Sequence, residues 1–514
     1  MKNKFIYLAV LAAGFAACEP EFENEVTNAD YSAGDADFTT YVAVGNSLTA
    51  GYMDGTVSRI GQSYSYPSLL AQQFAVVGGG AFTQPSYEED VNNLGGISGL
   101  PGFNTRLILD ASAGAPEPIA GTSTVTLAAQ AKAYNNMGVP GAKSYHLLAA
   151  GYGNAAGVAL GQANPYFVRH ATSASTTVLA DAMSLNPTFF TNWIGSNDVL
   201  LYAIAGGTGV NQAGNQNPAT YAQNDITDPG VFASAYSTIV NTLVSGGAKG
   251  VIATIPNVTS IPYFTTVPYN PLTTASLGGS ATVQQLNTSL YGPMKQVLTL
   301  LGQGTRLNLL SETEGNPILI TDETLTNLAP QLTAAFTSAG YPPATAAFIG
   351  SVYGQARQAT ATDLILLPAS SLIGTAPANV PAPFNVYGVT YPLQDGSVLI
   401  PSEIAMINTA TNSFNNTIKQ VATAKGLALA DMNAILAQLV TGLTTDDGQT
   451  YNAGYFSTAR LSTALFSLDG VHPNARGYAV VANEIIKVIN THYNAKLPAI
   501  NAGYYPGPTI LPSN

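Results

Sequence analysis

Charged residues are scarce in this chain of 514 residues: Asp, Glu, Lys and Arg make up only 9% of it, against about 25% in ordinary soluble domains. The scarcity does not indicate disorder, because 46% of the residues are hydrophobic and 9% are aromatic, enough to bury a large core. Basic residues are the rarer sign, with 17 Lys and Arg against 29 Asp and Glu. A surface with a net charge of −12 repels phosphate backbones, which excludes nucleic acid as a leading partner.

Cysteine is almost absent, because Cys18 is the only one in the chain. A single cysteine excludes both an internal disulfide framework and a cysteine-rich metal site. The histidines do not suggest a metal site either, since His146 and His170 have no carboxylate or thiol neighbours at ligand spacing. We therefore expect no metal centre.

The N-terminal apolar run is too short to cross a membrane. It covers residues 5–17, which is 13 residues, and follows a start with two lysines, whereas a spanning helix needs about 20 residues. A basic start followed by a short apolar run is typical of a secretion signal. We therefore expect residues 1–17 to be a leader that is removed.

The leader ends in Phe-Ala-Ala followed by Cys18, which resembles the lipobox of bacterial lipoproteins. The resemblance implies that Cys18 is acylated and anchors the chain to the outer membrane of the cell envelope; the alternative is an ordinary signal peptide followed by a chance cysteine. The next residues are strongly acidic, so residues 18–37 are predicted to form a flexible tether. Such acidic starts also resemble the surface-export signals of Bacteroidetes lipoproteins, which adds surface exposure as an expectation.

Beyond the tether, short buried strands alternate with helices, which predicts an α/β fold. Strands are expected at 38–44, 188–194, 250–255 and 427–430, and helices at 68–74, 175–185, 231–245, 403–424 and from 475 onward. Alternation of this kind favours a parallel sheet that helices cover on both faces.

Two long segments, 79–133 and 257–400, do not fit this alternation and are interpreted as insertions. Both are rich in Gly, Pro, Thr and Ala. Neither a repeat nor a convincing break in composition marks a second domain. We therefore expect one domain over residues 38–495, followed by a C-terminal tail at 496–514.

Three short motifs place polar groups where they can act on a ligand. Ser47, in Gly-Asn-Ser-Leu, directly follows the first strand, at the edge where open α/β sheets bind ligands, although a serine in this place is more often a helix cap. Gly141 closes the segment Asn-Met-Gly-Val-Pro-Gly, which either exposes a backbone N–H or simply makes a turn. Asn197, in Gly-Ser-Asn-Asp after the second strand, has an amide that can donate to a developing oxyanion.

The fourth motif, Asp-Gly-Val-His, supplies a base. Asp469 and His472 lie three residues apart in a loop that contains Gly and Pro. At this spacing the carboxylate can bind one imidazole nitrogen while the other nitrogen faces outward. A serine hydroxyl needs such a base, because it is a poor nucleophile at neutral pH. Each motif alone is most simply a structural loop, but four in this order favour a common active site.

Because Ser, Gly, Asn and Asp-x-x-His blocks occur in this order, the sequence resembles the SGNH or GDSL hydrolase superfamily. The resemblance implies a flavodoxin-like three-layer α/β/α sandwich. It also implies that Ser47 is the nucleophile, His472 the base and Asp469 the residue that orients the base. The oxyanion donors implied are the backbone N–H of Ser47, Gly141 and the side chain of Asn197.

The family resemblance further implies an enzyme without a cofactor that cleaves ester bonds. The leading expectation is a lipid-anchored extracytoplasmic serine esterase or lipase acting on carboxylic esters. One alternative is a carbohydrate esterase that removes acetyl groups from glycans, and another is a surface binding protein on a degenerate hydrolase core. The apolar runs within residues 328–373 also leave two possibilities: a satellite cluster against the core, or a wall over Ser47 that buries an acyl chain.

Overall fold

The computed structural model describes residues 30–110, 115–445, 448–457 and 460–511. The predicted leader and Cys18 lie outside these residues. Among the helices of the described part, none combines the length and the hydropathy that a membrane span requires.

A parallel sheet of five strands forms the centre of the fold. Its strands are β1 (Tyr41–Gly45), β4 (Asn136–Gly138), β5 (Phe189–Trp193), β6 (Lys249–Ala253) and β11 (Ala428–Ala430). They lie in the order β4-β1-β5-β6-β11, and every pair is parallel. Numbered in chain order, the strands therefore lie 2-1-3-4-5 across the sheet. The second strand lies on one side of the first and the third, fourth and fifth lie on the other, so the strand order reverses at the first strand.

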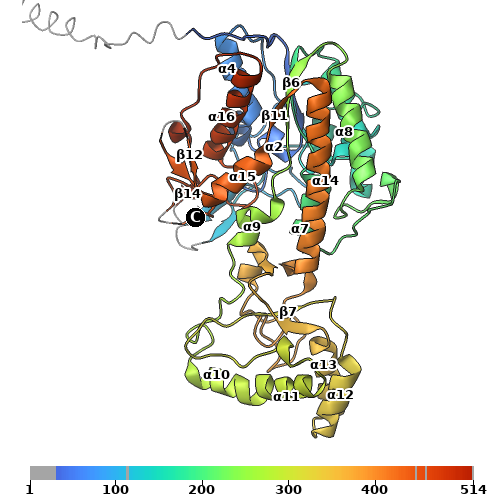
Figure 1. The fold of residues 1–514 in the computed structure, drawn as a ribbon, viewed down its shortest axis with the longest axis vertical. Coiled ribbons are helices and arrows are strands. Elements are labelled where there is room, and N and C mark those ends of the chain that lie inside the picture. Colours follow the sequence, from blue (N-terminus) through green and yellow to red (C-terminus); the bar gives the residue numbers. More distant parts are fainter. Residues whose placement is uncertain (1–29, 111–114, 446–447, 458–459, 512–514) are drawn as a thin grey trace, which may run out of the picture.

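Helices cover both faces of this sheet (Figure 1). α4 (Tyr66–Val76) packs with α16 (Ala475–His492) on one face, and α8 (Pro229–Leu243) packs with α14 (Pro401–Lys425) on the other. β1 and β5 are buried along their whole length, as strands covered on both sides must be. The predicted α/β fold with a parallel sheet is thus confirmed.

The remaining elements around the sheet are short. The helices are α2 (Ser47–Ala50), α3 (Arg59–Ser63), α5 (Pro165–His170), α6 (Val178–Met183), α7 (Asn197–Ile204), α9 (Pro262–Thr265) and α15 (Met432–Thr441). The additional strands are β2 (Leu107–Asp110), β3 (Pro116–Pro118), β12 (Leu443–Thr444), β13 (Thr450–Tyr451) and β14 (Ile510–Leu511). Three of these elements bear on the site described below: α2, α7 and α15.

Residues 267–400, here called the lobe, build a second hydrophobic core (Figure 1). The lobe contains α10 (Ser280–Leu286), α11 (Gly292–Leu300), α12 (Ala329–Ser338) and α13 (Pro343–Tyr353), with the short strands β7 (Leu319–Thr321), β8 (Ala356–Gln358), β9 (Leu364–Ile365) and β10 (Val398–Leu399). Most of its buried apolar side chains form a cluster separate from the one around the sheet, to which Leu366 and Leu399 belong. Leu332, Phe336 and Ile349, from the apolar runs at 328–373, are buried in this cluster. Of the two possibilities for these runs, the structure therefore has the satellite cluster.

Part of the predicted tether is packed against the domain. Ser32 forms a β-bridge with Lys496, and the N–H of Asp35 donates to the carbonyl of Tyr493 at 2.7 Å. The tether predicted for residues 18–37 therefore ends before Ser32. The sequence does not reveal where the tether ends, because the contacts of Ser32 and Asp35 with the domain are made by backbone groups.

The predicted C-terminal tail and the first insertion are also ordered against each other. β14, in the tail, pairs with β2, in the insertion, which in turn pairs with β3. Ile500 and Ala502 are buried. The tail predicted for residues 496–514 is thus part of the fold over its described length.

Candidate active site

Ser47, His472 and Asp469 form one hydrogen-bonded chain at the carboxyl edge of the sheet. Nε2 of His472 lies 2.9 Å from Oγ of Ser47, and Nδ1 of the same ring lies 2.9 Å from Oδ2 of Asp469. Ser47 begins α2 directly after β1, whereas the other two residues lie in the loop before α16. The fold thus brings Ser47 to two predicted residues that follow it in the chain by more than 400 positions.

The turn between β1 and α2 presents the Ser47 hydroxyl. Asn46 caps α2, because its side-chain oxygen accepts the N–H of Leu48 at 3.0 Å. A Cβ at Gly45 would lie 2.1 Å from Oγ1 of Thr49 and 2.8 Å from the carbonyl of Trp193, so only glycine fits where β1 meets the turn. The turn therefore holds Ser47 at the end of the strand.

The carboxylate of Asp469 is held by several donors. Its Oδ1 accepts the N–H groups of Val471 and His472 and the hydroxyl of Ser467, each at 2.9 Å. Its Oδ2 also accepts the N–H of Gly55 at 3.1 Å. Burial acts to raise the pKa of Asp469, but the His472 ring and the backbone N–H groups outweigh burial and lower this pKa to about 2. The carboxylate is thus ionised and held in position against the ring.

A second aspartate, Asp54, fastens the same loop from the side of α2. Its Oδ1 accepts the N–H of Leu468 at 2.9 Å, and its own N–H donates to the hydroxyl of Ser467 at 3.0 Å. Burial, together with the nearby charge of Asp469, raises the pKa of Asp54 to about 6, although the Leu468 bond opposes this. The sequence analysis did not identify Asp54, and no local signal marks it, because its partners lie more than 400 residues away.

The predicted oxyanion donors include groups that no protein acceptor occupies. Within the described residues, the N–H groups of Ser47 and Gly141 donate to no protein acceptor, and Gly141 has a φ of +79°. Asn197, at the start of α7, is 3% exposed and uses one amide hydrogen to bind the carbonyl of Ala142 at 2.9 Å. Its second amide hydrogen remains available. The bond from Asn197 to Ala142 therefore ties the start of α7 to the loop that carries Gly141.

Asp198 locks this loop to α7. Its carboxylate is fully buried and accepts both the N–H and the hydroxyl of Ser144, each at 2.8 Å. Burial raises the pKa of Asp198, and the two Ser144 bonds oppose that rise. Asp198 thus connects the segment after β4 with the segment after β5, and it does not contact Ser47 or His472.

These groups converge where the strand order of the sheet reverses. β1 lies between β4 and β5, with Ala43 opposite both Asn136 and Thr191. Ligands of open α/β sheets bind outside the carboxyl ends of the strands at such a reversal. The missed strand β4 brings the segment that carries Gly141 alongside β1, the strand that precedes Ser47. Its three residues show no alternation of polar and apolar side chains that would have predicted it.

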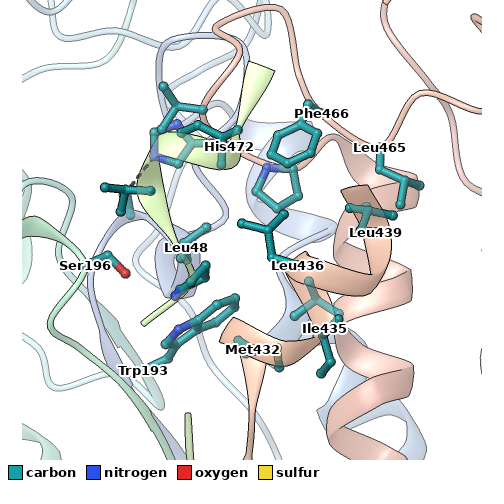
Figure 2. A pocket seen from close by; sticks show the side chains of 18 of the residues that line it. Leu48, Trp193, Ser196, Met432, Ile435, Leu436, Leu439, Leu465, Phe466 and His472 are labelled. Carbon is teal, nitrogen blue, oxygen red and sulfur yellow. Dashed lines mark hydrogen bonds between the residues drawn. The ribbon is translucent and has the colours of Figure 1, made fainter. Parts of the chain in front are cut away.

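An apolar pocket opens beside Ser47 and His472 (Figure 2). It encloses about 900 Å³ when the open solvent at its mouth is included. Its apolar lining includes Leu48, Trp193, Leu200, Met432, Ile435, Leu436, Leu439, Leu465, Phe466, Val480 and Val481. Figure 2 shows the α15 side chains facing Leu48 and Trp193 across this space. Helix α15 was not predicted from the sequence. Residues 328–373, for which an acyl wall was one of the two possibilities, do not line the pocket.

The other histidines lie away from this chemistry. Burial lowers the pKa of both His146 and His170 to about 3, so both rings are neutral. Nε2 of His492, the last residue of α16, lies 3.1 Å from the carbonyl of Gly426, which caps α14. None of the three rings lines the pocket beside Ser47.

Comparison with known proteins finds no match for this chain among family models, curated proteins or solved structures.

Proposed function

We propose that this protein is a serine hydrolase of the SGNH or GDSL type, which cleaves carboxylic esters through an acyl-enzyme on Ser47. The observation that carries the proposal is the chain from Ser47 through His472 to Asp469, with both hydrogen-bond distances at 2.9 Å. This is the arrangement in which an imidazole can take the proton of a serine hydroxyl while a carboxylate stabilises the resulting charge.

The catalytic cycle follows from the placement of these groups. Nε2 of His472 takes the hydroxyl proton as Oγ of Ser47 attacks the ester carbonyl carbon, and the ionised Asp469 stabilises the imidazolium. The oxyanion accepts hydrogen bonds from the N–H groups of Ser47 and Gly141 and from the Asn197 amide. His472 then protonates the departing alcohol. A water activated by the same ring hydrolyses the acyl-enzyme, which releases the acid and restores Ser47.

The architecture supports the same family. The strand order 2-1-3-4-5 is that of flavodoxin-like sheets, whose ligands bind at the reversal beside the first strand. Ser47 and Asn197 follow the two neighbouring strands at this reversal. Asn46, which stands where the family has aspartate, still caps α2 and leaves the hydroxyl of Ser47 in place.

The pocket favours an acyl-ester substrate over an acetylated glycan. An acetyl group needs room for one methyl, whereas the space beside Ser47 continues between apolar side chains of α15 and α16. Each CH₂ buried contributes about 0.8 kcal/mol. The six CH₂ groups that separate acetyl from octanoyl therefore set an upper limit of about 5 kcal/mol, or roughly 3,000-fold in kcat/KM.

The test is hydrolysis of p-nitrophenyl acetate, butyrate and octanoate by wild type and two variants. We expect kcat/KM to rise with acyl length in the wild type. Leu436→Trp fills the pocket and should lower kcat/KM for octanoate by about tenfold or more, since several CH₂ groups lose their contacts, with little effect on acetate. Val440→Trp, on the exposed side of the same helix, is the matched control and should change neither.

Other outcomes would favour the alternatives. A strict preference of the wild type for acetate would favour the glycan acetylesterase. A Ser47→Ala protein serves as the inactive control. If the folded wild type hydrolyses every ester no faster than this control, a binding protein on a hydrolase core would be favoured.

We also propose that a lipid on Cys18 anchors the enzyme to the cell envelope. The support is the sequence around Cys18, a short apolar leader followed by the single cysteine. Cys18→Ser protein that is still exported should leave the membrane fraction, as measured by immunoblotting of fractionated cells. Membrane association of this variant equal to that of the wild type would contradict the anchor.

A further inference from the structure

Two polar side chains in the wall of the pocket have no role in the reaction described above. The polar side chains that line the pocket belong to Asn46, Ser47, Trp193, Ser196, Asn197 and His472. Ser47, Asn197 and His472 are assigned to ester cleavage. Nε1 of Trp193 is occupied, because it donates to the carbonyl of Thr254 at 3.1 Å. Asn46 and Ser196 therefore remain to be explained.

The hydroxyl of Ser196 is buried and has no hydrogen-bond partner. The residue is 4% exposed, and its Oγ binds no group in the described part of the chain. A serine before a helix usually caps that helix, but Ser196, which precedes α7, makes no cap bond with its side chain. In Figure 2 its oxygen points toward the side of the pocket that Leu48 and Trp193 border. The structural use expected of this serine is thus absent.

The amide of Asn46 is also only half bonded. Its Oδ1 accepts the N–H of Leu48 as the cap of α2, which identifies the other terminal atom as Nδ2. The residue is 1% exposed, and Nδ2 donates to no acceptor among the described residues. Buried polar groups nearly always have a partner, so each exception calls for an explanation. Two such exceptions in one pocket wall indicate a ligand that binds both.

Both groups belong to the segments that bind the reacting end of the ester. Asn46 directly precedes the nucleophile Ser47, and Ser196 directly precedes Asn197, whose amide is assigned to the oxyanion. These segments follow β1 and β5, which are neighbours in the sheet. The part of the lining that comes from α15 and α16 is apolar. A ligand that fills the pocket therefore meets the two polar groups near its carbonyl and apolar groups further along.

We propose that the substrate is an ester of a hydroxy acid, whose acyl chain carries a hydroxyl on C2 or C3 that binds Asn46 and Ser196. The inference rests on the proposed hydrolysis at Ser47, which puts the acyl chain in this pocket. A hydroxyl both accepts and donates, so it can accept a hydrogen bond from Nδ2 of Asn46 and donate one to Oγ of Ser196. C2 and C3 are the first carbons beyond the carbonyl, and hence the ones nearest to the two residues.

The experiment compares four methyl esters as substrates of the full chain: octanoate, 2-hydroxyoctanoate, 3-hydroxyoctanoate and 8-hydroxyoctanoate. Acid release is followed in a pH-stat, and each kcat/KM is divided by the rate constant of alkaline hydrolysis, which removes differences in intrinsic reactivity. We expect the 2-hydroxy or the 3-hydroxy ester to exceed octanoate by about tenfold or more, because a plain chain leaves two buried polar groups unbonded. The 8-hydroxy ester should fall below octanoate, since its hydroxyl would lie among the apolar side chains of α15.

Two variants separate binding of the substrate hydroxyl from general effects on activity. Ser196→Ala should lower the preference for the hydroxy ester over octanoate by about fivefold or more, as expected from the loss of one hydrogen bond. Tyr236→Phe is the matched control, because it removes another buried hydroxyl that lacks a partner among the described residues but does not line the pocket. This control should keep the wild-type preference. The preference is a ratio measured within one variant, so a change in overall activity cancels.

The remaining outcomes overturn the inference in distinguishable ways. If neither the 2-hydroxy nor the 3-hydroxy ester exceeds octanoate, the inference fails while the proposed hydrolysis stands, and the two polar groups hold only a water molecule. An unchanged preference in Ser196→Ala would refute the binding of the hydroxyl by this residue. If the wild type hydrolyses none of the esters faster than Ser47→Ala, the proposed function fails and the inference fails with it.

Discussion

Exchanging Asp469 for asparagine tests the hydrogen-bonded chain at the site with the least change in shape. In the structure Oδ1 of Asp469 faces three donors, two backbone N–H groups and the Ser467 hydroxyl. The amide oxygen of an asparagine should therefore take the Oδ1 position, and its NH₂ group should face Nδ1 of His472 and the N–H of Gly55.

This orientation reverses the tautomer of the histidine. The NH₂ group can only donate, so Nδ1 of His472 must accept and the ring proton moves to Nε2, which faces Ser47. The imidazole then cannot take the serine proton. We expect kcat to fall by about 10⁴, equivalent to about 5.5 kcal/mol of transition-state stabilisation. KM should change little, because the apolar pocket is untouched.

The assay is kcat for p-nitrophenyl octanoate, with Tm measured in parallel. The N–H of Gly55 loses its acceptor, which should cost about 1–3 kcal/mol of stability but leave the protein folded. Asp54→Asn is the matched control, since it is a buried aspartate beside the same loop that keeps its acceptor oxygen for Leu468. A folded Asp469→Asn protein with kcat within tenfold of wild type would refute the role assigned to the bond between Asp469 and His472.

Two further predictions concern neighbouring groups. Asn197→Ala should lower kcat by about 10²–10³ with little change in KM, because its free amide hydrogen meets charge that develops only in the transition state; steady-state kinetics would instead show a change in KM alone if Asn197 served only ground-state binding. The pKa of Asp54 is about 6 in the folded protein against 3.8 for the free group, so the folded state binds more protons in this window and loses stability as the pH rises through it. Asp54→Asn should therefore gain stability relative to wild type from about pH 4 to about pH 7, by at most about 3 kcal/mol, and a pH-independent difference in urea unfolding would contradict this.

Local pattern was enough to predict the central layers of this protein. The strands at β1, β5, β6 and β11, with the helices α8, α14 and α16, were predicted to within a few residues, because buried strands and amphipathic helices each leave a periodic signal in the sequence. Ser47, Asn197, Asp469 and His472 could be selected for a different reason. Each motif alone is most simply a cap or a loop, but four motifs in this order favour a common site.

The pocket and the contacts of Asp54 with the loop before α16 were decided by tertiary structure alone. Leu436 lines the pocket together with side chains of α16, and Asp54 binds Ser467 and Leu468, which follow it by more than 400 residues. Such contacts depend on which segments the chain brings together over tens to hundreds of residues, and a periodic pattern records only whether a side chain is buried. The sequence therefore determined the layers and the candidate site residues, whereas the tertiary structure decided what lies beside them, because burial is encoded locally and the choice of neighbour is not.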